Sequence, residues 1–121
     1  MYEMKPFELW LAKLPHSCDA HSRIRRPVVI VSEPTDGGWV SVVPCTTDLI
    51  RAQRPTHVLL QEQGLHKDSR ALCERVQTVQ CACLVRRIGT VYQPFDRYAL
   101  HHALASHFGL GGFESSSSYE N

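Results

Sequence analysis

The stretch that decides the fold is Arg26–Thr47, which reads RPVVIVSEPTDGGWVSVVPCTT. It contains two apolar runs, Val28–Val31 and Trp39–Val43, and both are rich in β-branched residues. The residues between the runs supply turn chemistry: Pro34, Asp36, Gly37 and Gly38. Two apolar runs separated by turn-forming residues predict a β-hairpin.

The polar residues of this stretch lie at its two ends. Antiparallel pairing brings the start of one strand next to the end of the other, so we expect Arg26 to lie close to Thr46 and Thr47. Arginine presents a fork of N–H donors that matches phosphate oxygens, and it stays charged at physiological pH. The alternative role of Thr46 is to end the strand with a local backbone hydrogen bond. The pattern predicts a fixed cation that faces two hydroxyl groups.

These blocks resemble a known family. Their order, RPVVIVS, VVPCTT, RPTHVLL, DSRALCERVQTV and IGTV, is similar to that of the MazF/PemK (Kid) toxin endoribonucleases, and the likeness covers most of Phe7–Leu110. It implies a mainly β fold, a small SH3-like barrel with a C-terminal α-helix. It also implies a homodimer, a partner antitoxin and cleavage of single-stranded RNA without a metal or other cofactor.

Length and composition bound the class of protein. The 121 residues suit a single domain, which we place at residues 1–110, followed by a flexible tail at 111–121 that is rich in serine and glycine. No apolar run approaches the roughly 20 residues that a membrane span needs. Met1–Pro15 lacks the basic start and unbroken apolar core of a secretory signal. The sequence therefore predicts a cytoplasmic protein that is not in a membrane.

The net charge of +1 is too small to indicate a nucleic-acid-binding protein. Basic residues nevertheless gather in HSRIRRP and LVRRIG, and either group could face a phosphate chain or form ordinary solvated surface. Four residues are expected to contact the RNA in addition to the catalytic residues discussed below: Arg25, Thr47, His21 and Arg86.

Five cysteines and seven histidines require that a zinc site be weighed. The one close cysteine pair is Cys81-x-Cys83, which does not have the spacing of structural zinc sites. His102 and His107 fall on a predicted amphipathic helix, where histidine is unremarkable. The sequence favours unpaired cysteines in a reducing compartment over a metal site or disulfides.

Cleaving RNA without a metal requires a base for the 2′-hydroxyl, a donor for the leaving oxygen and positive charge at the phosphate. Arg26 can supply the charge and Thr46 can hold a phosphate oxygen. The resemblance implies that Glu74 is the base, because the Kid branch has an aspartate at this position. The alternative is a surface carboxylate paired with Arg75 or Arg86. His21 or His57 could act as the base instead.

The predicted loop His16–Arg25 departs from the family's G-x-E-Q-x-G-x-RP pattern, since it has no glycine and carries Asp19 and His21. Two other functions therefore stay open. The barrel is also used by CcdB-like toxins, which bind a partner and cut nothing, and a degenerate member could keep partner binding without catalysis. The RP and CTT blocks favour the nuclease.

Other segments are predicted from pattern. Phe7–Ala12 and His57–Leu60 read as strands. Propensity does not settle Ser69–Val79, for which the resemblance favours strand. Cys81–Arg87 could form a single helical turn that Gly89 stops before a last strand at Gly89–Tyr92.

The clearest helix is Pro94–Phe108, with proline in its first turn and Gly109 as its stop. We expect an apolar stripe of this helix to pack on the barrel: Phe95, Ala99, Leu100, Ala103, Leu104 and Phe108. Trp39 could stack on RNA, but core packing is the favoured prediction.

Overall fold

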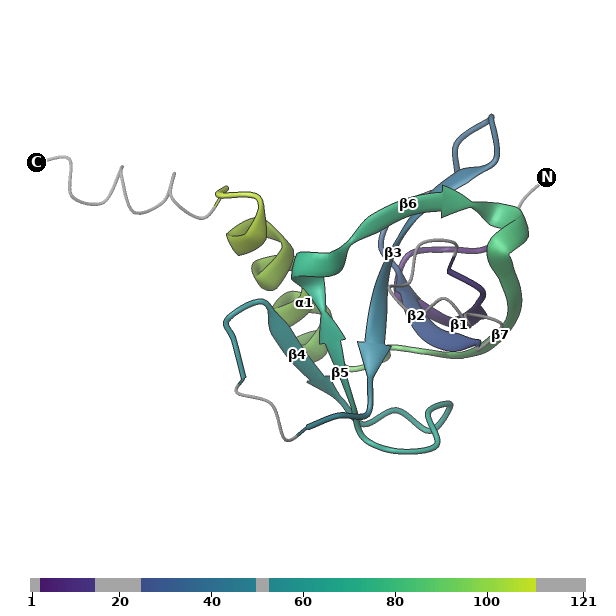
Figure 1. The fold of residues 1–121 in the computed structure, drawn as a ribbon. Coiled ribbons are helices and arrows are strands. Elements are labelled where there is room, and N and C mark those ends of the chain that lie inside the picture. The colour runs from purple at the N-terminus through teal and green to yellow at the C-terminus, as the bar shows by residue number, and fades with distance from the viewer. Residues whose placement is uncertain (1–2, 15–24, 50–52, 111–121) are drawn as a thin grey trace, which may run out of the picture.

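A computed structural model of the chain describes residues 3–14, 25–49 and 53–110 (Figure 1). The elements of this part are β1 (Glu8–Ala12), β2 (Arg26–Ile30), β3 (Trp39–Thr46), β4 (His57–Leu60), β5 (Ser69–Leu72), η1 (Cys73–Arg75), β6 (Gln77–Gln80), η2 (Cys81–Cys83), β7 (Leu84–Thr90) and α1 (Pro94–His107). The predicted class, mainly antiparallel β-sheet with one C-terminal helix, is confirmed. Within the described ranges, no helix has the length and apolar character of a membrane span.

The predicted hairpin forms the centre of the sheet. Val28 pairs with Pro44 and Ile30 pairs with Val42, so β2 and β3 are antiparallel neighbours. Gly38 closes the turn by donating its N–H to the Thr35 carbonyl at 2.9 Å, and its φ of 83° is a backbone conformation that glycine adopts readily. The strand order is β4-β5-β3-β2-β1-β7, and β6 also pairs with β3.

Strand β3 changes its partner part-way along. Its first half pairs with β6 as far as Val42, and its last residues, Cys45 and Thr46, pair with β5. Pro44, which has no N–H to donate, lies between these two pairings, where a missing ladder donor is tolerated best. The change carries the end of β3 out of the barrel and beside β5, while β6 and β7 curve around β1 and β2 (Figure 1).

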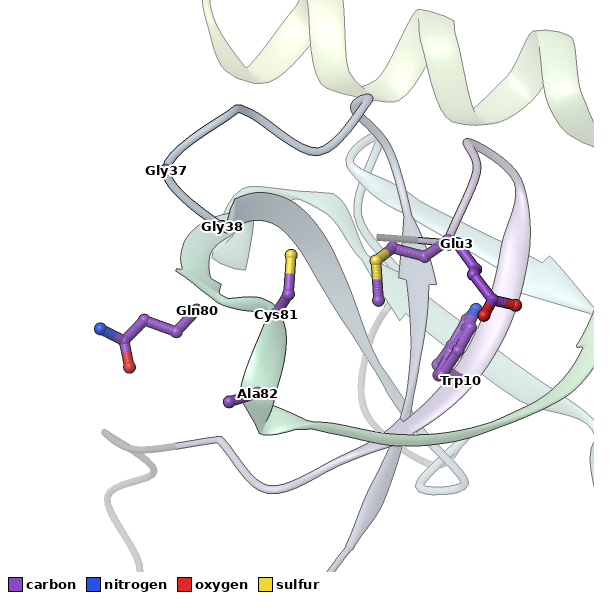
Figure 2. Close-up of a pocket in the computed structure, with 8 residues that line it drawn as sticks. Glu3, Trp10, Gly37, Gly38, Gln80, Cys81 and Ala82 are labelled. Atoms are coloured by element: carbon purple, nitrogen blue, oxygen red, sulfur yellow. The ribbon is translucent and has the colours of Figure 1, made fainter. Parts of the chain in front are cut away.

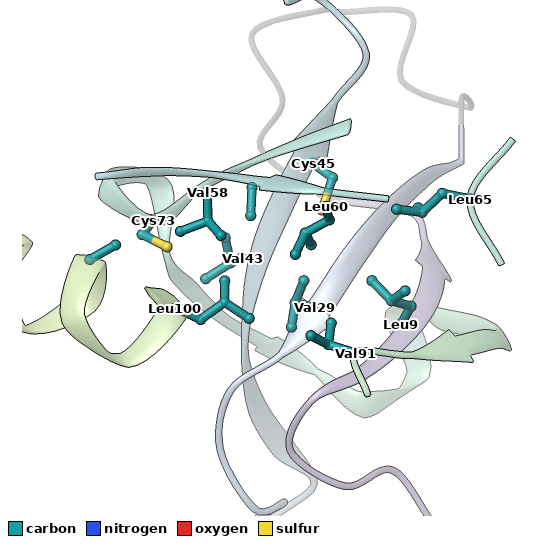
Figure 3. Close-up of a cluster of buried hydrophobic side chains, with 12 residues drawn as sticks. Leu9, Val29, Val43, Cys45, Val58, Leu60, Leu65, Cys73, Val91 and Leu100 are labelled. Carbon is teal, nitrogen blue, oxygen red and sulfur yellow. The ribbon is translucent and has the colours of Figure 1, made fainter. Parts of the chain in front are cut away.

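Two hydrophobic clusters lie on opposite faces of β2 and β3. The cluster on the α1 side, which we call the helix-side cluster, contains Leu9, Val29, Val43, Cys45, Val58, Leu60, Leu65, Ala71, Cys73, Val91, Leu100 and Ala103 (Figure 3). The other, the barrel cluster, contains Met4, Ala12, Leu14, Val28, Ile30, Val40, Val42, Val79, Cys81 and Leu84. Burial on both faces explains why β2 and β3 are largely apolar and rich in β-branched residues. Each fully buried valine or leucine contributes about 1.5–3 kcal/mol.

Two segment predictions were wrong in their boundaries. The stretch predicted as one strand, Ser69–Val79, is divided by the 3₁₀ turn η1. The turn lies where the chain passes from β5, which pairs with the end of β3, to β6, which pairs with its first half. The helical turn predicted over Cys81–Arg87 is limited to Cys81–Cys83, and Gly89 lies inside β7. Gly89 lies against Gly64 of another segment. A Cβ added at Gly64 would lie 2.1 Å from the Ile88 carbonyl oxygen, so this approach requires glycine at position 64.

The helix prediction is confirmed apart from its ends. Leu100 and Ala103 are buried, and Gly109 has a φ of 77° just beyond the last turn. Phe95 and Phe108, expected to pack, are 77% and 60% exposed, because only the middle of α1 lies over β4 and η1. Trp39, expected in the core, is 44% exposed at the turn end of β3.

Candidate functional site at the end of the hairpin

Arg26 is the first residue of β2 and Thr46 is the last residue of β3. The final pair of the two strands is Val28 with Pro44, and extending this register by two residues brings Arg26 opposite Thr46. Both residues are partly buried. Their alternation with Val28 and Val42 places both side chains on the face of the barrel cluster. The hairpin thus brings the predicted cation and hydroxyl to one end of the sheet.

The Thr46 hydroxyl makes a local backbone hydrogen bond at the end of β3, which was the predicted alternative to a role at the phosphate. Its Oγ1 accepts a hydrogen bond from the Asp48 N–H at 3.1 Å. A hydroxyl that accepts one bond still has its own proton to donate. The strand-ending role and a role toward substrate are therefore compatible, and the Asp48 amide restricts the direction in which the hydroxyl points.

Arg70 is a site residue that the sequence analysis missed. It lies on β5, pairs with Thr46 and is 8% exposed. One guanidinium nitrogen, Nη2, donates to the Leu49 carbonyl oxygen at 3.2 Å. The available signal was an arginine within the otherwise uncharged strand Ser69–Leu72, a position where burial is expensive unless the charge is paired.

Glu74 lies on η1 with both carboxylate oxygens engaged. Oε1 accepts from the Thr56 hydroxyl at 2.9 Å, and Oε2 lies 3.0 Å from His57 Nε2. The predicted pairing with Arg75 or Arg86 is therefore wrong. Partial burial raises the pKa of this carboxyl, but hydrogen bonds from its backbone amide, His57 and Thr56 outweigh burial, and the net pKa is lowered. A lowered pKa makes the carboxylate a weaker proton acceptor.

The hydrogen bonds of His57 fix its ring. Nδ1 accepts the Arg54 N–H at 3.3 Å, so the proton of the neutral ring belongs on Nε2, from which it is donated to Glu74. The side chain is 6% exposed. His57, an alternative base in the sequence analysis, thus has both ring nitrogens engaged within the protein.

The remaining predicted residues are placed unequally. Arg25 and Thr47 are exposed neighbours of Arg26 and Thr46. Arg86 is exposed on β7, in the row of Leu11 and separated from β2 by β1, so the sheet does not bring it to Arg26. His21 and most of the predicted loop His16–Arg25 lie outside the described residues, as does the predicted tail at 111–121.

The cysteines of the described ranges are unpaired. Burial, with a smaller contribution from a neighbouring charge, raises the pKa of Cys45 and of Cys73 to about 12. Burial also raises the pKa of Cys81. These thiols stay protonated at neutral pH and are poor nucleophiles. Across residues 3–14, 25–49 and 53–110, no three His, Cys, Asp or Glu side chains gather closely enough to hold a metal ion.

A cavity of about 510 Å³ lies at the opposite end of β3 from Thr46. Cys81 and Trp10 border it from η2 and β1, whereas Gln80 points outward (Figure 2). Among the described residues that line it, Glu3 supplies the one carboxylate and none carries a positive charge that could bind a phosphate. We therefore place the candidate site at Arg26 and Thr46 instead.

Comparison with known proteins identifies the family of the chain. Residues 5–107 match the family model described as PemK-like, MazF-like toxin of type II toxin–antitoxin systems. The chain belongs to this toxin family. A search of curated proteins gave no match.

Solved structures of MazF-type toxins share the fold. A mycobacterial endoribonuclease in complex with its cognate antitoxin is 21% identical, with 89% of this chain and 97% of that one covered at a TM-score of 0.71. The Mycobacterium tuberculosis toxin MazF-mt6 is 26% identical over 85% of this chain and 97% of its own, at a TM-score of 0.68. MazF from Deinococcus radiodurans is 19% identical over 90% and 99%, at 0.69.

Proposed function

We propose that this MazF-like toxin is an endoribonuclease that cuts single-stranded RNA without a metal. The 2′-hydroxyl gives its proton to a base, its oxygen attacks the adjacent phosphorus, and the bond from phosphorus to the 5′-oxygen breaks. The leaving 5′-oxygen takes up a proton from water, so the products are a 2′,3′-cyclic phosphate and a 5′-hydroxyl. The observation that carries the proposal is the juxtaposition of Arg26 and Thr46 at one end of the hairpin. The endoribonucleases among the structural relatives support it.

Arg26 and Thr46 divide the work at the phosphate. In this mechanism the guanidinium of Arg26 binds two non-bridging oxygens and stabilises the charge that grows on them in the pentavalent transition state. The Thr46 hydroxyl donates its proton to one of these oxygens, because its bond with the Asp48 N–H uses it only as an acceptor. Arg25 and Thr47, exposed beside them, contact the neighbouring nucleotides.

Two residues are candidates for the base that accepts the 2′-hydroxyl proton. Glu74 was the sequence-based choice, but its two hydrogen-bonded oxygens and lowered pKa suit it better to holding Thr56 and His57 in place. We therefore favour His21, which lies outside the described residues, and assign Glu74 a structural role. The variant Glu74→Gln separates these assignments, because it should lose activity only if Glu74 is the base.

We also propose that the chain forms a homodimer and binds a cognate antitoxin. Relatives were crystallised with their antitoxins, including MazE with MazF from Deinococcus radiodurans. An acidic, partly disordered antitoxin segment would cover the Arg26 end, because carboxylates can occupy the place of phosphates. Light scattering that gave only a 13.7 kDa species at micromolar concentration would contradict the dimer.

The decisive experiment uses a long single-stranded RNA and purified protein in EDTA. Cleavage should proceed, and treatment of the 3′ ends should identify the cyclic phosphate. A matched RNA with one 2′-deoxy nucleotide at the cleavage site should bind but resist cutting there. No cleavage of any RNA would favour a CcdB-like binding toxin or a degenerate member. Activity that requires added magnesium would contradict the mechanism.

A further inference from the structure

Arg70 is the charged side chain that is buried within the part of the chain that the structure describes. Burial of a guanidinium is strongly unfavourable unless its donors find partners, so a buried arginine on a short strand calls for a specific polar role. Neither hydrophobic cluster includes it. Its role must therefore be sought on the other face of β5.

The sheet register places Arg70 beside the candidate site. Ala71 pairs with Cys45, and both side chains belong to the helix-side cluster. Side chains alternate along a strand, so Arg70 and its partner Thr46 point to the opposite face, side by side in one row. This row lies in the direction of Arg26, on the next strand.

The hydrogen bonds connect Arg70 to Thr46 through the loop that follows β3. Arg70 Nη2 donates to the Leu49 carbonyl, and the preceding residue, Asp48, donates its N–H to Thr46 Oγ1. The arginine thus holds the segment that carries the Asp48 amide. That amide in turn restricts which way the Thr46 hydroxyl points its own proton.

We propose that Arg70 is a positioning residue that fixes the Asp48 amide and thereby aims the Thr46 hydroxyl at the substrate phosphate. The inference rests on the proposed nuclease function for its kinetic consequence, but its structural content stands apart from catalysis. Arg70 contacts the protein backbone and acts on the phosphate through Thr46. Its loss should therefore lower kcat and leave KM little changed, since the Thr46 hydroxyl gains most of its value in the transition state.

A double-mutant cycle tests the connection. Arg70→Met, which keeps much of the stem and removes the donors, should lower kcat by about tenfold in the wild-type background. In a Thr46→Ala background the same change should lower kcat by less than about twofold, because the hydroxyl that it positions is already absent. Equal losses in both backgrounds would show that Arg70 only supports the fold, and would overturn the inference.

Arg70→Lys guards against simple unfolding. Lysine keeps the charge but carries its donors on one nitrogen instead of three, so kcat should fall by about threefold and the fall should again vanish in the Thr46→Ala background. If Arg70→Met does not fold, this variant alone decides the outcome. The matched control is Arg75→Met, a change at an exposed arginine on η1, which should leave kcat unaltered.

Amide exchange decides the inference without catalysis. In Arg70→Met the Asp48 amide should exchange with solvent at least about tenfold faster, whereas Arg75→Met should leave it unchanged. An Asp48 amide that is equally protected in Arg70→Met would overturn the positioning role. If the wild type cuts no RNA while this exchange effect is present, the proposed function fails and the positioning role stands.

Discussion

The two ends of the connection between β3 and β4 differ in how many of their polar side-chain atoms have a hydrogen-bond partner within the protein. At the far end, Thr56 and His57 each bond to one carboxylate oxygen of Glu74, and the second ring nitrogen of His57 accepts a backbone N–H. At the near end, Thr46 accepts from Asp48 and keeps a proton to donate. A closed network holds a loop in place, while a group with a donor to spare can act on a substrate.

One segment, β5 followed by η1, contacts both ends of this connection. Arg70 on β5 reaches the near end through Leu49, and Glu74 on η1 reaches the far end through Thr56. The Cys73 N–H also donates to the Thr56 carbonyl at 2.9 Å. We infer that the β5–η1 segment sets the geometry of the connection, and that the chemistry is confined to its near end. Four experiments test this difference between the two ends.

The largest expected effect is at Arg26. Arg26→Ala should lower kcat/KM for RNA cleavage by at least about hundredfold, the loss typical of one transition-state donor. The melting temperature should change little, because Arg26 is the first residue of β2 and belongs to neither hydrophobic cluster. Arg75→Ala, a change at an exposed arginine, is the control and should cut at the wild-type rate. Full activity in Arg26→Ala would show that the site has been misplaced.

A smaller effect is expected at Thr46. Thr46→Ala removes a neutral hydrogen bond rather than a charge, so kcat should fall by about tenfold. Thr46→Ser keeps the hydroxyl and should retain most of the activity. Single-turnover cleavage at saturating protein measures this step without product release. Loss of activity in both variants alike would indicate that the methyl group, rather than the hydroxyl, is what matters.

Glu74 should affect stability more than rate. Glu74→Gln weakens the contacts with His57 and Thr56, so the free energy of unfolding should fall by about 1–2 kcal/mol, measured by urea denaturation. The rate of RNA cleavage by the folded variant should fall by less than about threefold. A hundredfold loss of kcat with unchanged stability would instead restore Glu74 as the general base.

The smallest expected effect is on the stability of the protein at acidic pH. The pKa of Glu74 is lowered in the folded state, so its stabilising contribution is present above about pH 4.5 and is lost as the pH falls through the folded value. Wild-type protein should therefore lose stability below about pH 4.5 more steeply than Glu74→Gln does. Urea midpoints collected across that range give the comparison, and parallel curves would argue against the closed network.

Much of the fold could be predicted from the chain. The β-branched runs of Arg26–Thr47, their turn residues and the spacing of Pro94–Phe108 are local patterns, and the hairpin and helix that they predict are confirmed. The turn η1 was not predicted, and the helical turn predicted over Cys81–Arg87 was correct only for η2, Cys81–Cys83. Both turns arise where the chain must pass from one strand partner to the next, which no local pattern records.

The candidate site divides in the same way. Arg26 and Thr46 could be assigned to one place because both belong to a single hairpin, whose register follows from pairing across one turn. Arg70 and the partners of Glu74 could not, because β5 reaches β3, and η1 reaches Thr56, across long stretches of chain. Local patterns were enough to predict the hairpin, the helix and the residues at the hairpin's end. That the buried Arg70 lies beside Thr46 is known only from the folded sheet, because long-range strand pairing depends on how the whole sheet packs.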